Sequence, residues 1–317
     1  MNVPDVSVIV PCYNAARWLP AALDSALDQH GATAEVVVID DGSTDDSRTT
    51  AERYAARGVR IVAQRHRGAG AARNRGLAET RGRWIQFLDA DDLLGTNKLS
   101  LQCAALRTAP AQAVASCAWG RFRGGRSPDT AAFLDLEVFR DYLPAWEFLR
   151  QQARTGCMMH PAAWLLPRTL VESAGGWDES FTLNDDGEYF ARILSRATEI
   201  RFVSVARTFY RSHASGSLSR RHHAEALRSL YRAALGLENE LRRCDASPST
   251  EAAVAEMWER LRFELYPNAP DLSADAAFRA RRGDYRPTTR LPCGPRLKWL
   301  ASLGGWKIAR RLQTRFR

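Results

Sequence analysis

The sequence predicts an α/β protein with a mostly parallel, doubly wound sheet and a helical C-terminal extension. Within the first 90 residues, short apolar runs alternate with helical patterns in the order β-α-β-α-β-α-β. This order is typical of a parallel sheet with helices on both faces, the arrangement of nucleotide-binding halves. From about residue 222 to 265 the pattern is helical throughout, with charge on one face.

The four strands predicted in this first half are short and apolar. VSVIV (6–10) and EVVVID (35–40) are rich in β-branched residues, and GVRIVAQ (58–64) and RWIQFL (83–88) follow. Helices are expected between them over residues 18–27, 45–57 and 69–79. The helix at 45–57 follows DGSTDDS, which supplies turn and helix-capping residues.

The second half alternates less regularly. The patterns predict helices at 97–107, 145–152, 168–174 and 185–197, strands at 112–118 and 199–211, and a loop at 120–135. We therefore expect an α/β domain over residues 1–218, with a nucleotide-binding half (1–95) and an acceptor or catalytic half (96–218). A helical extension (219–280) and a basic amphipathic tail (281–317) complete the predicted organisation.

Composition narrows the class of protein. With 317 residues, 45% of them hydrophobic, the chain can bury a large core. Its six cysteines are scattered without a C-x-x-C pair, which favours reduced thiols over disulfides or structural zinc. The N-terminal residues do not resemble a signal peptide, and no apolar run approaches 18 residues. We expect a cytoplasmic protein that is soluble, or peripheral on the inner face of the membrane.

The positive charge belongs to the tail. Residues 281–317 hold eleven Lys or Arg and one acidic residue, a local net charge of +10 in a chain whose total is +9. The tail also contains aromatic and aliphatic residues, so it could lie on an anionic membrane surface. The alternatives are an amphipathic helix docked on the protein and a disordered basic end. No nucleic-acid-binding motif accompanies the charge, so we expect no specific nucleic-acid partner.

Three carboxylates follow the strand RWIQFL. Asp89, Asp91 and Asp92 stand within four positions, where like charges repel by roughly 1 to 4 kcal/mol per pair at about 4 Å. Asp92 could simply cap the next helix. A bound cation would relieve the repulsion, and oxygen ligands select a hard metal such as Mg²⁺ or Mn²⁺, which substrate phosphates usually complete. The motif therefore predicts a metal and a phosphorylated ligand.

Two other strands also end in polar residues. The first ends in P-C-Y-N (11–14) and the second in I-D-D-G-S (39–43). Turn chemistry explains Gly42, Ser43 and Thr44 without a ligand, but it does not explain the paired carboxylates Asp40 and Asp41. Because ligands of open α/β sheets bind at the carboxyl ends of strands, we expect these segments and the D-A-D-D segment to line one crevice.

In order along the chain, VSVIVPCYN, VVVIDDGSTDDS, GAGAARNRGL, FLDADD, GGWDESF and NDDGEYFARIL resemble the successive motifs of family 2 glycosyltransferases. The resemblance covers about residues 4–218. It implies the Rossmann-like GT-A fold and an inverting transfer of sugar from a nucleotide-sugar donor, often UDP-linked.

The resemblance also implies site residues. A donor site is expected from Pro11, Tyr13, Asn14, Asp40, Asp41, Arg73, Asn74, Asp89 and Asp91. Of these, Pro11 and Tyr13 would lie beside the nucleobase, Asp41 would read the uracil edge, and Arg73 and Asn74 would face the diphosphate or ribose. For Arg73 and Asn74 the alternative is a solvated helix face.

The metal, Mn²⁺ or Mg²⁺, is expected on Asp91, Asp92 and His213. His213 belongs to YRSHASGSLS, which resembles a shorter family motif, although a single histidine can also be structural.

The general base implied by the resemblance is Asp186. It is the second residue of an acidic pair that follows the G-G-W-D-E turn, with Asp185 where the family has Glu. Glu188 is a near neighbour, and acidic residues in a first helical turn also stabilise the helix.

These observations favour a metal-assisted inverting glycosyltransferase that acts on a saccharide or lipid-linked acceptor in cell-surface polysaccharide or glycolipid synthesis. A nucleotidyltransferase would normally carry a Gly-rich phosphate loop where VPCYNAARW stands. A dehydrogenase would show G-x-G-x-x-G after the first strand, which GAGAARNRG is not. A non-catalytic nucleotide-sugar-binding protein on a decayed transferase fold would lose the metal or base carboxylates, which are present.

Overall fold

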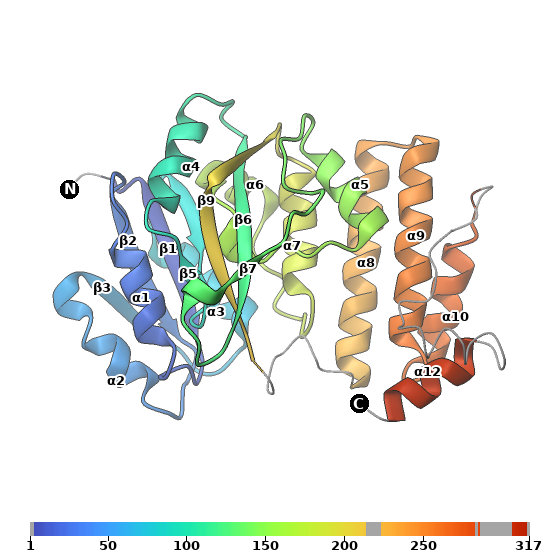
Figure 1. Cartoon of the computed structure of the whole chain (residues 1–317), viewed down its shortest axis with the longest axis horizontal. Coiled ribbons are helices and arrows are strands. Elements are labelled where there is room, and N and C mark those ends of the chain that lie inside the picture. Colours follow the sequence, from blue (N-terminus) through green and yellow to red (C-terminus); the bar gives the residue numbers. More distant parts are fainter. Residues whose placement is uncertain (1–2, 214–222, 283–284, 286–305, 316–317) are drawn as a thin grey trace. The chain divides into compact units, whose positions relative to one another are not determined.

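The computed structural model describes residues 3–213, 223–282, 285 and 306–315 (Figure 1). The chain divides into two compact units. The sheet unit comprises Met1–Glu147, Met158–Phe181 and Arg192–Ser217, and the helical unit comprises Phe148–Cys157, Thr182–Ala191 and Leu218–Arg317. Each unit is described below by itself.

The sheet unit is built on a five-stranded sheet of order β3-β2-β1-β4-β8. Its strands are β3 (Val59–Ala63), β2 (Ala34–Asp40), β1 (Val6–Cys12), β4 (Trp84–Phe87) and β8 (Leu166–Pro167). The first four are parallel, with Val8 beside Val36 on one side and Gln86 on the other, and β8 is antiparallel to β4. The prediction of a parallel core is confirmed.

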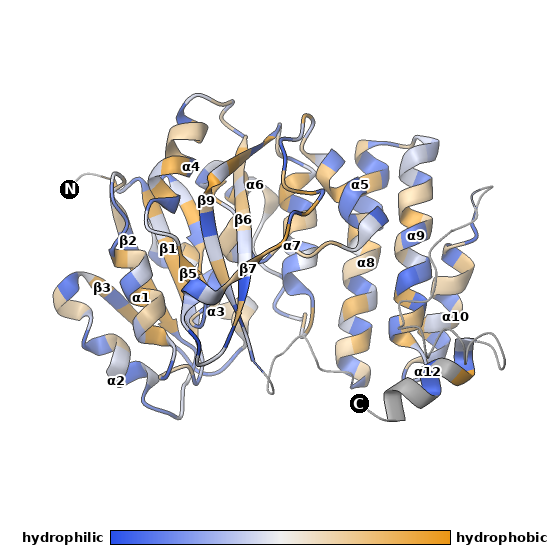
Figure 2. Cartoon of the chain, viewed as in Figure 1, coloured by the Kyte–Doolittle hydropathy of each residue, from blue (hydrophilic) through white to orange (hydrophobic). Residues whose placement is uncertain are grey.

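Helices cover both faces of this sheet, because alternate strand residues point to opposite sides. Val6, Val8 and Val10 of β1 share a buried cluster with α1 (Leu19–Leu27) and α4 (Lys98–Arg107). On the other face, α3 (Ala69–Glu79) packs on Val37 and Ile39 through Ala72 and approaches Ile9 at Gly76. The apolar strands are visible in Figure 2. The doubly wound arrangement is therefore also confirmed.

One predicted helix is shorter than expected. The helix expected over 45–57 is split into α2 (Ser47–Glu52) and the 3₁₀ turn η1 (Ala55–Arg57). Gly58 ends this turn at φ +89°, a left-handed conformation that glycine adopts at little cost.

A second sheet has the order β5-β9-β6-β7. It contains β5 (Leu93–Leu94), β9 (Ile200–Ser212), β6 (Val114–Arg123) and β7 (Ala132–Phe133), with β6 and β9 parallel and the other pairs antiparallel. The loop prediction for 120–135 is wrong at its ends, because β6 continues to Arg123 and β7 lies within the range. In β6, buried Trp119 and Phe122 anchor a segment that reads as polar because of its exposed arginines.

Helices make up the regular structure of the described helical unit. They are α8 (Ala224–Cys244), α9 (Pro248–Leu265), α10 (Pro270–Arg279) and α12 (Trp306–Arg315), with most of α5 (Trp146–Thr155) and α7 (Asp185–Leu194). The helical pattern of 222–265 is interrupted at Ser247, whose hydroxyl caps α9 by accepting from the Thr250 amide, with Pro248 at the first helical position. The buried Glu238 accepts from Trp258 (2.9 Å) and Arg279 (3.2 Å).

Most of the basic tail predicted over 281–317 lies outside the described residues. Its described helix, α12, packs Trp306 edge-on against Phe263 (4.9 Å) and Tyr266 (5.1 Å). Arg310 is buried and donates to the Phe263 carbonyl (2.9 Å). For α12, these contacts favour the alternative of an amphipathic helix docked on the protein over a disordered end. Among the described residues, no helix has the length and apolar character needed to cross a bilayer.

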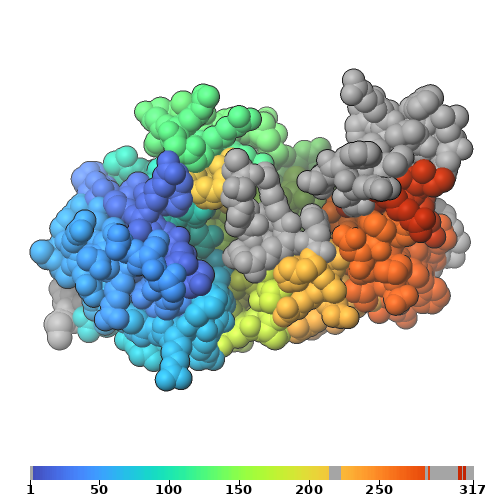
Figure 3. All heavy atoms as spheres, turned by 90° about the horizontal axis from the view of Figure 1, so that it is seen from below, coloured from blue at the N-terminus to red at the C-terminus, as the bar shows by residue number. Residues whose placement is uncertain are grey.

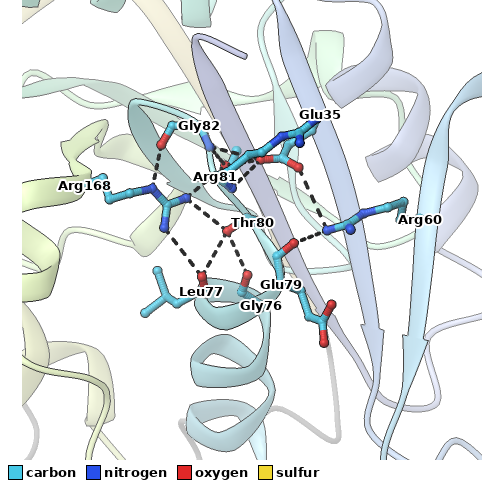
Figure 4. A network of polar contacts seen from close by, with 10 residues as sticks. Glu35, Arg60, Gly76, Leu77, Glu79, Thr80, Arg81, Gly82 and Arg168 are labelled. Atoms are coloured by element: carbon cyan, nitrogen blue, oxygen red, sulfur yellow. Dashed lines mark hydrogen bonds and ion pairs between the residues drawn. The ribbon is translucent and has the colours of Figure 1, made fainter. Parts of the chain in front are cut away.

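The amino ends of β1 and β2 are closed by a polar network (Figure 4). Arg168, at the start of α6 (Arg168–Ala174), donates to the Gly82 carbonyl (2.7 Å) and to Ser7 and Thr80 (both 3.2 Å). Burial alone would raise the pKa of Glu35, but hydrogen bonds from Arg81, Ser7 and Gly82 bring that pKa below its ordinary value. This network pins the strand ends opposite to those that carry the candidate site.

Candidate functional site

The carboxyl ends of β1, β2 and β4 meet at one edge of the five-stranded sheet, which we call the main sheet. The Asp41 amide donates to the Cys12 carbonyl (2.8 Å), and the Leu88 amide donates to the Ile9 carbonyl (3.0 Å). The segments after each strand are therefore neighbours. The structure thus brings the three segments side by side, and the crevice that they were expected to line stays a prediction.

The loop after β1 holds one exposed ring and one structural amide. Tyr13 is 46% exposed and stacks on His66 with ring centroids 4.1 Å apart. Asn14 adopts φ +50°, and its side-chain oxygen accepts from the Thr44 amide (2.8 Å) and the Asp45 amide (3.3 Å). Asn14 therefore fastens the first loop to the second, whereas Tyr13 and His66 offer an aromatic surface. Pro11 lies within β1, paired with Ile39.

Both carboxylates at the end of β2 are buried. The Asp41 carboxylate accepts from the Arg67 amide (2.9 Å), the Gly68 amide (2.8 Å) and the Gln64 side chain (2.7 Å). His66 Nδ1 lies 2.9 Å from this carboxylate. Asp40 accepts from the Ser43 amide (3.2 Å), the turn contact expected for this motif. Asp41 thus organises the entry to α3. The donors between residues 64 and 68 were not foreseen, although the polar stretch QRHRG between strand and helix was a usable signal.

Arg73 and Asn74 both belong to α3, but their side chains contact different groups. Arg73 is buried, forms an ion pair with Asp89 (2.8 Å) and stacks over the Trp177 ring at 4.3 Å. The Asn74 amide is bonded to the Trp177 backbone, donating to its carbonyl (2.9 Å) and accepting from its N–H (2.7 Å). Neither residue belongs to a solvated helix face. Arg73 brings positive charge to the carboxylates, and Asn74 holds the G-G-W turn.

The carboxylates of D-A-D-D take separate partners. Asp89 pairs with Arg73, and Asp91 Oδ2 lies 2.7 Å from His213 Nε2. Asp92 is 1% exposed, accepts from the Arg211 amide (2.8 Å) and lies 3.1 Å from His160 Nδ1. Burial raises the pKa of Asp91, and the charge of Asp89 raises it further; the pKa of Asp92 lies well above its ordinary value for the same reasons.

His160 is a residue that sequence reasoning missed. It is buried, and its Nε2 lies 2.8 Å from the Thr208 hydroxyl while its Nδ1 faces Asp92. It lies far from the D-A-D-D segment in the sequence, within MMHPAAW, and no motif marks it.

The metal-ligand assignment stays a prediction, and the structure brings two of its three residues together. Asp91 and His213 lie together, whereas the Asp92 carboxylate is directed to His160 and the Arg211 backbone. Within the described ranges, no three His, Cys, Asp or Glu side chains form a metal-holding group. A carboxylate beside an imidazole still fits Mg²⁺ or Mn²⁺, which bind through few protein ligands when substrate phosphates complete the coordination.

Asp186 belongs to the helical unit. It lies in the first turn of α7 with Asp185 and Glu188, and its carboxylate accepts from the Gly187 amide (2.9 Å). Asn184 precedes the helix at φ +59°, a conformation that fixes the chain's entry into this turn. The acidic first turn also suits the positive end of a helix dipole.

Comparison with known proteins identifies the family. A model described as glycosyl transferase family 2 matches residues 7–171. The succinoglycan biosynthesis protein ExoO of Rhizobium meliloti (strain 1021) is 44% identical over 99 residues, 31% of this chain and 28% of ExoO. Chondroitin synthase of Escherichia coli is 40% identical over 102 residues, 32% of this chain and 15% of that protein. The chain thus matches less than a third of the length of these relatives.

Solved structures share the fold over most of the chain. S. aureus TarS 1–349, in complex with UDP-GlcNAc, has a TM-score of 0.68 at 17% identity, covering 87% of this chain and 81% of that one. The mannosyltransferase PcManGT from Pyrobaculum calidifontis, in complex with GDP-Man and Mn²⁺, has a TM-score of 0.56 at 22% identity, covering 99% and 84%. The expected GT-A-type α/β fold with a helical C-terminal part is confirmed.

The family match spans more than half of the 317 residues and contains the three strand ends that form the site. This chain belongs to glycosyl transferase family 2.

Proposed function

We propose that this protein transfers a sugar from a nucleoside-diphosphate donor, UDP-linked, to a hydroxyl of a saccharide or lipid-linked acceptor, with inversion. The observation that carries the proposal is the edge of the main sheet, where Asp41, Arg73, Asp89 and the Asp91–His213 pair come together. Complexes of structural neighbours with UDP-GlcNAc and with GDP-Man support a nucleotide-sugar donor. Relatives in succinoglycan and chondroitin synthesis support a role in cell-surface polysaccharide or glycolipid synthesis.

Different residues at this edge suit the nucleoside, the diphosphate and the metal of a bound donor. The exposed Tyr13 ring with His66, beside the carboxylates Asp40 and Asp41, suits the nucleoside. Arg73 is a buried cation beside the carboxylates and suits the diphosphate. Asp91 and His213 would hold Mn²⁺ or Mg²⁺, which when bound supplies positive charge to the leaving diphosphate.

Asp186 is the proposed general base. Its carboxylate accepts the proton of the acceptor hydroxyl, and the acceptor oxygen forms a bond to the anomeric carbon of the donor. The bond from that carbon to the diphosphate oxygen breaks, and its electron pair leaves with the nucleoside diphosphate. Arg73 offsets the charge that develops on the leaving group. A single displacement of this kind inverts the anomeric centre and needs no covalent enzyme intermediate.

A panel of UDP- and GDP-sugars tests the donor assignment. Thermal stabilisation and donor hydrolysis are measured with Mn²⁺, with Mg²⁺ and with a chelator. We expect at least one UDP-sugar to stabilise the protein and to be hydrolysed only with metal. Asp91→Asn combined with His213→Gln should raise the metal concentration needed for half-maximal activity, whereas Asp129→Asn, on the exposed 3₁₀ turn η2 (Pro128–Thr130), should not. If no donor stabilises the protein under any of these conditions, a non-catalytic role replaces this proposal.

We also propose that the protein associates with the inner face of the membrane through its tail. The local charge of +10 over residues 281–317 supports attraction to anionic headgroups. A lipid-linked acceptor would be presented at that surface.

A further inference from the structure

A cavity of about 500 Å³ lies in the sheet unit, beside the second sheet. Its walls come from β6, from the segment that leads to β7 and beyond, and from Ser212 at the end of β9. Trp119, Leu134 and Leu136 give it apolar sides. The green surface around residues 120–136 lies beside the blue N-terminal segment in Figure 3. A concave site with apolar walls and a few charged groups is the usual form of a small-molecule site.

The charged groups of this cavity are all arginines. Arg121, Arg123 and Arg126 line it, and all three are exposed. The strand alternation explains the first two, since they flank the buried Phe122 and point to the opposite face of β6. Arg121 also stacks near the rings of Trp119 (5.8 Å) and Tyr210 (5.4 Å).

These arginines have no carboxylate partner within the described part of the chain. Elsewhere in the sheet unit arginines form ion pairs, as Arg67 does with Glu179 (2.6 Å) and Arg107 with Asp5 (2.9 Å). Several guanidinium groups around one cavity repel one another unless an anion is bound. A guanidinium binds carboxylate and phosphate groups through paired hydrogen bonds.

The cavity adjoins the metal-binding pair. Ser212 is followed directly by His213, whose Nε2 contacts Asp91 at 2.7 Å. The Gly124 amide, between two of the arginines, donates to the Ser212 carbonyl (2.9 Å). A β-carbon on Gly124 would lie 3.2 Å from His213 Nδ1, so this turn packs directly on the imidazole.

We propose that this cavity is the acceptor site and that it selects an anionic saccharide, one that bears a carboxylate or a phosphate. The inference rests on the proposed function and adds the substrate class of the acceptor. Donor-binding candidates lie at the carboxyl edge of the main sheet, whereas Arg121 and Arg123 lie on β6 of the second sheet and Arg126 lies in the turn that follows β6. The anionic group binds Arg121, Arg123 and Arg126, and the sugar ring packs on Trp119.

Three probes that differ only at C6 test the inference: p-nitrophenyl β-glucoside, its 6-phosphate and p-nitrophenyl β-glucuronide. Their binding to the full chain is measured by equilibrium dialysis, without a donor. We expect one or both anionic probes to bind about tenfold or more tightly than the glucoside. The preferred probe identifies the anion as carboxylate or phosphate.

Variants assign the preference to the cavity. Arg121→Gln/Arg123→Gln/Arg126→Gln should abolish the preference for anionic probes, and the corresponding Lys triple, which keeps the charge, should retain part of it. Arg48→Gln/Arg53→Gln, at exposed positions in and directly after α2, should bind all probes as the wild type does. Circular dichroism checks that each variant is folded.

Two results would overturn the inference: equal binding of all three probes, or a preference that survives in the Gln triple. A separate measurement, stabilisation of the wild type by UDP-sugars without any acceptor, bears on the proposed function. Because dialysis needs no donor, failure of the acceptor inference can be told apart from failure of the donor proposal.

Discussion

Asp89, Asp91 and Asp92 occupy four successive positions of the chain with one alanine, yet each carboxylate meets a different nitrogen group. Arg73 offsets the charge of Asp89, His213 contacts Asp91, and His160 with the Arg211 amide surrounds Asp92. Repulsion within the motif is thus reduced by contacts from distant segments. Asp91 and His213 are both partly exposed, whereas Asp92 and His160 are buried, which makes the Asp91–His213 pair the more accessible place for a cation.

Asp186→Asn tests the proposed base. The amide keeps the size of the side chain but cannot accept a proton, so turnover should fall by about 10²- to 10⁴-fold while donor affinity is unchanged. Initial rates and calorimetric titration with the donor measure the two quantities. Glu188→Gln, in the same helical turn, is the matched control and should keep near-normal turnover. Near-normal turnover of the Asp186 variant with donor still bound would remove it as the base.

The buried Lys98 should make the free energy of unfolding depend on pH. Lys98 is 1% exposed and donates to Gln86 Oε1 and the Trp164 carbonyl. Burial lowers the pKa of Lys98 from 10.5 to about 8. Between these pH values the unfolded chain keeps the proton and the folded chain loses it, so the contribution of Lys98 to the free energy of unfolding should rise with pH, by up to about 3 kcal/mol.

Lys98→Met is the control for this prediction. Denaturant unfolding of both proteins at pH 7 and pH 10 gives the difference between their free energies of unfolding at each pH. We expect the free energy of unfolding of the wild type, relative to that of the variant, to be larger at pH 10 than at pH 7. Parallel pH profiles would contradict the lowered pKa.

At the scale of single residues, sequence reasoning found the segments of the site better than the roles within them. Tyr13, Asp41 and Asp91 were expected from motifs at strand ends, which do lie together, and Arg73 was expected from the AARN motif of the helix that became α3. His160 was missed because its contact with Asp92 joins residues 68 positions apart. Such a contact leaves no periodic or local signal. Asn14 and Asn74 were expected at the donor, but their amides hold loops, which only the fold could reveal.

At the scale of elements, the contact between α3 and β1 depends on a glycine. A β-carbon on Gly76 would overlap Ile9 Cγ2, so Gly76→Ala should destabilise the fold by about 1–3 kcal/mol through overpacking. Chemical denaturation measures the change. Gly70→Ala in the same helix meets its nearest atom at an ordinary 3.6 Å and should be neutral or stabilising by up to about 1 kcal/mol.

A double variant checks the cause. If the clash with Ile9 is responsible, Gly76→Ala should cost less in an Ile9→Ala background, and the difference is the coupling between the two sites. If Gly76→Ala lowers the free energy of unfolding equally in both backgrounds, the clash with Ile9 is not the cause.

Strands that are continuous apolar runs were predicted well from the sequence. The strand segment that mixes polar, glycine and aromatic residues was not. The strands β1, β2 and β4 are apolar runs that are mostly buried on both sides, so the sequence alone indicates them. The end of β6 was taken for a loop because RFRGGR is polar and Gly-rich. Its strand character comes from pairing with β9, which is distant in sequence, and with the nearby β7. Tertiary pairing of this kind overrides local preference.

At the scale of the whole molecule, charge is divided unevenly along the chain. The tail from residue 281 carries a net +10, which leaves the remaining 280 residues close to neutral. The arginine-lined cavity of the sheet unit is therefore a local concentration of charge within a nearly neutral region. Attraction to a membrane and selection of an anionic acceptor would depend on different cations, so the two can be tested independently.

The membrane proposal predicts a loss of vesicle binding when charge is removed from the tail. Arg286, Arg290, Arg296 and Lys298 replaced by Gln spare the packing of Trp306 and Arg310 in α12. At about 1 kcal/mol per cation near an anionic surface, removal of four cations should lower the affinity for anionic vesicles on the order of a thousandfold. Flotation with phosphatidylserine-containing vesicles at about 0.1 M salt measures it, and neutral phosphatidylcholine vesicles should bind neither protein.

A matched control removes the same charge from the sheet unit through the exposed Arg48, Arg53, Arg65 and Arg75. Only the tail variant should lose flotation, because a polybasic segment acts within a Debye length of the surface, about 10 Å at moderate salt. Equal flotation of the tail variant and the wild type would exclude the tail as the anchor. Equal losses in both variants would mean that total charge governs binding, with no role for the tail as a segment.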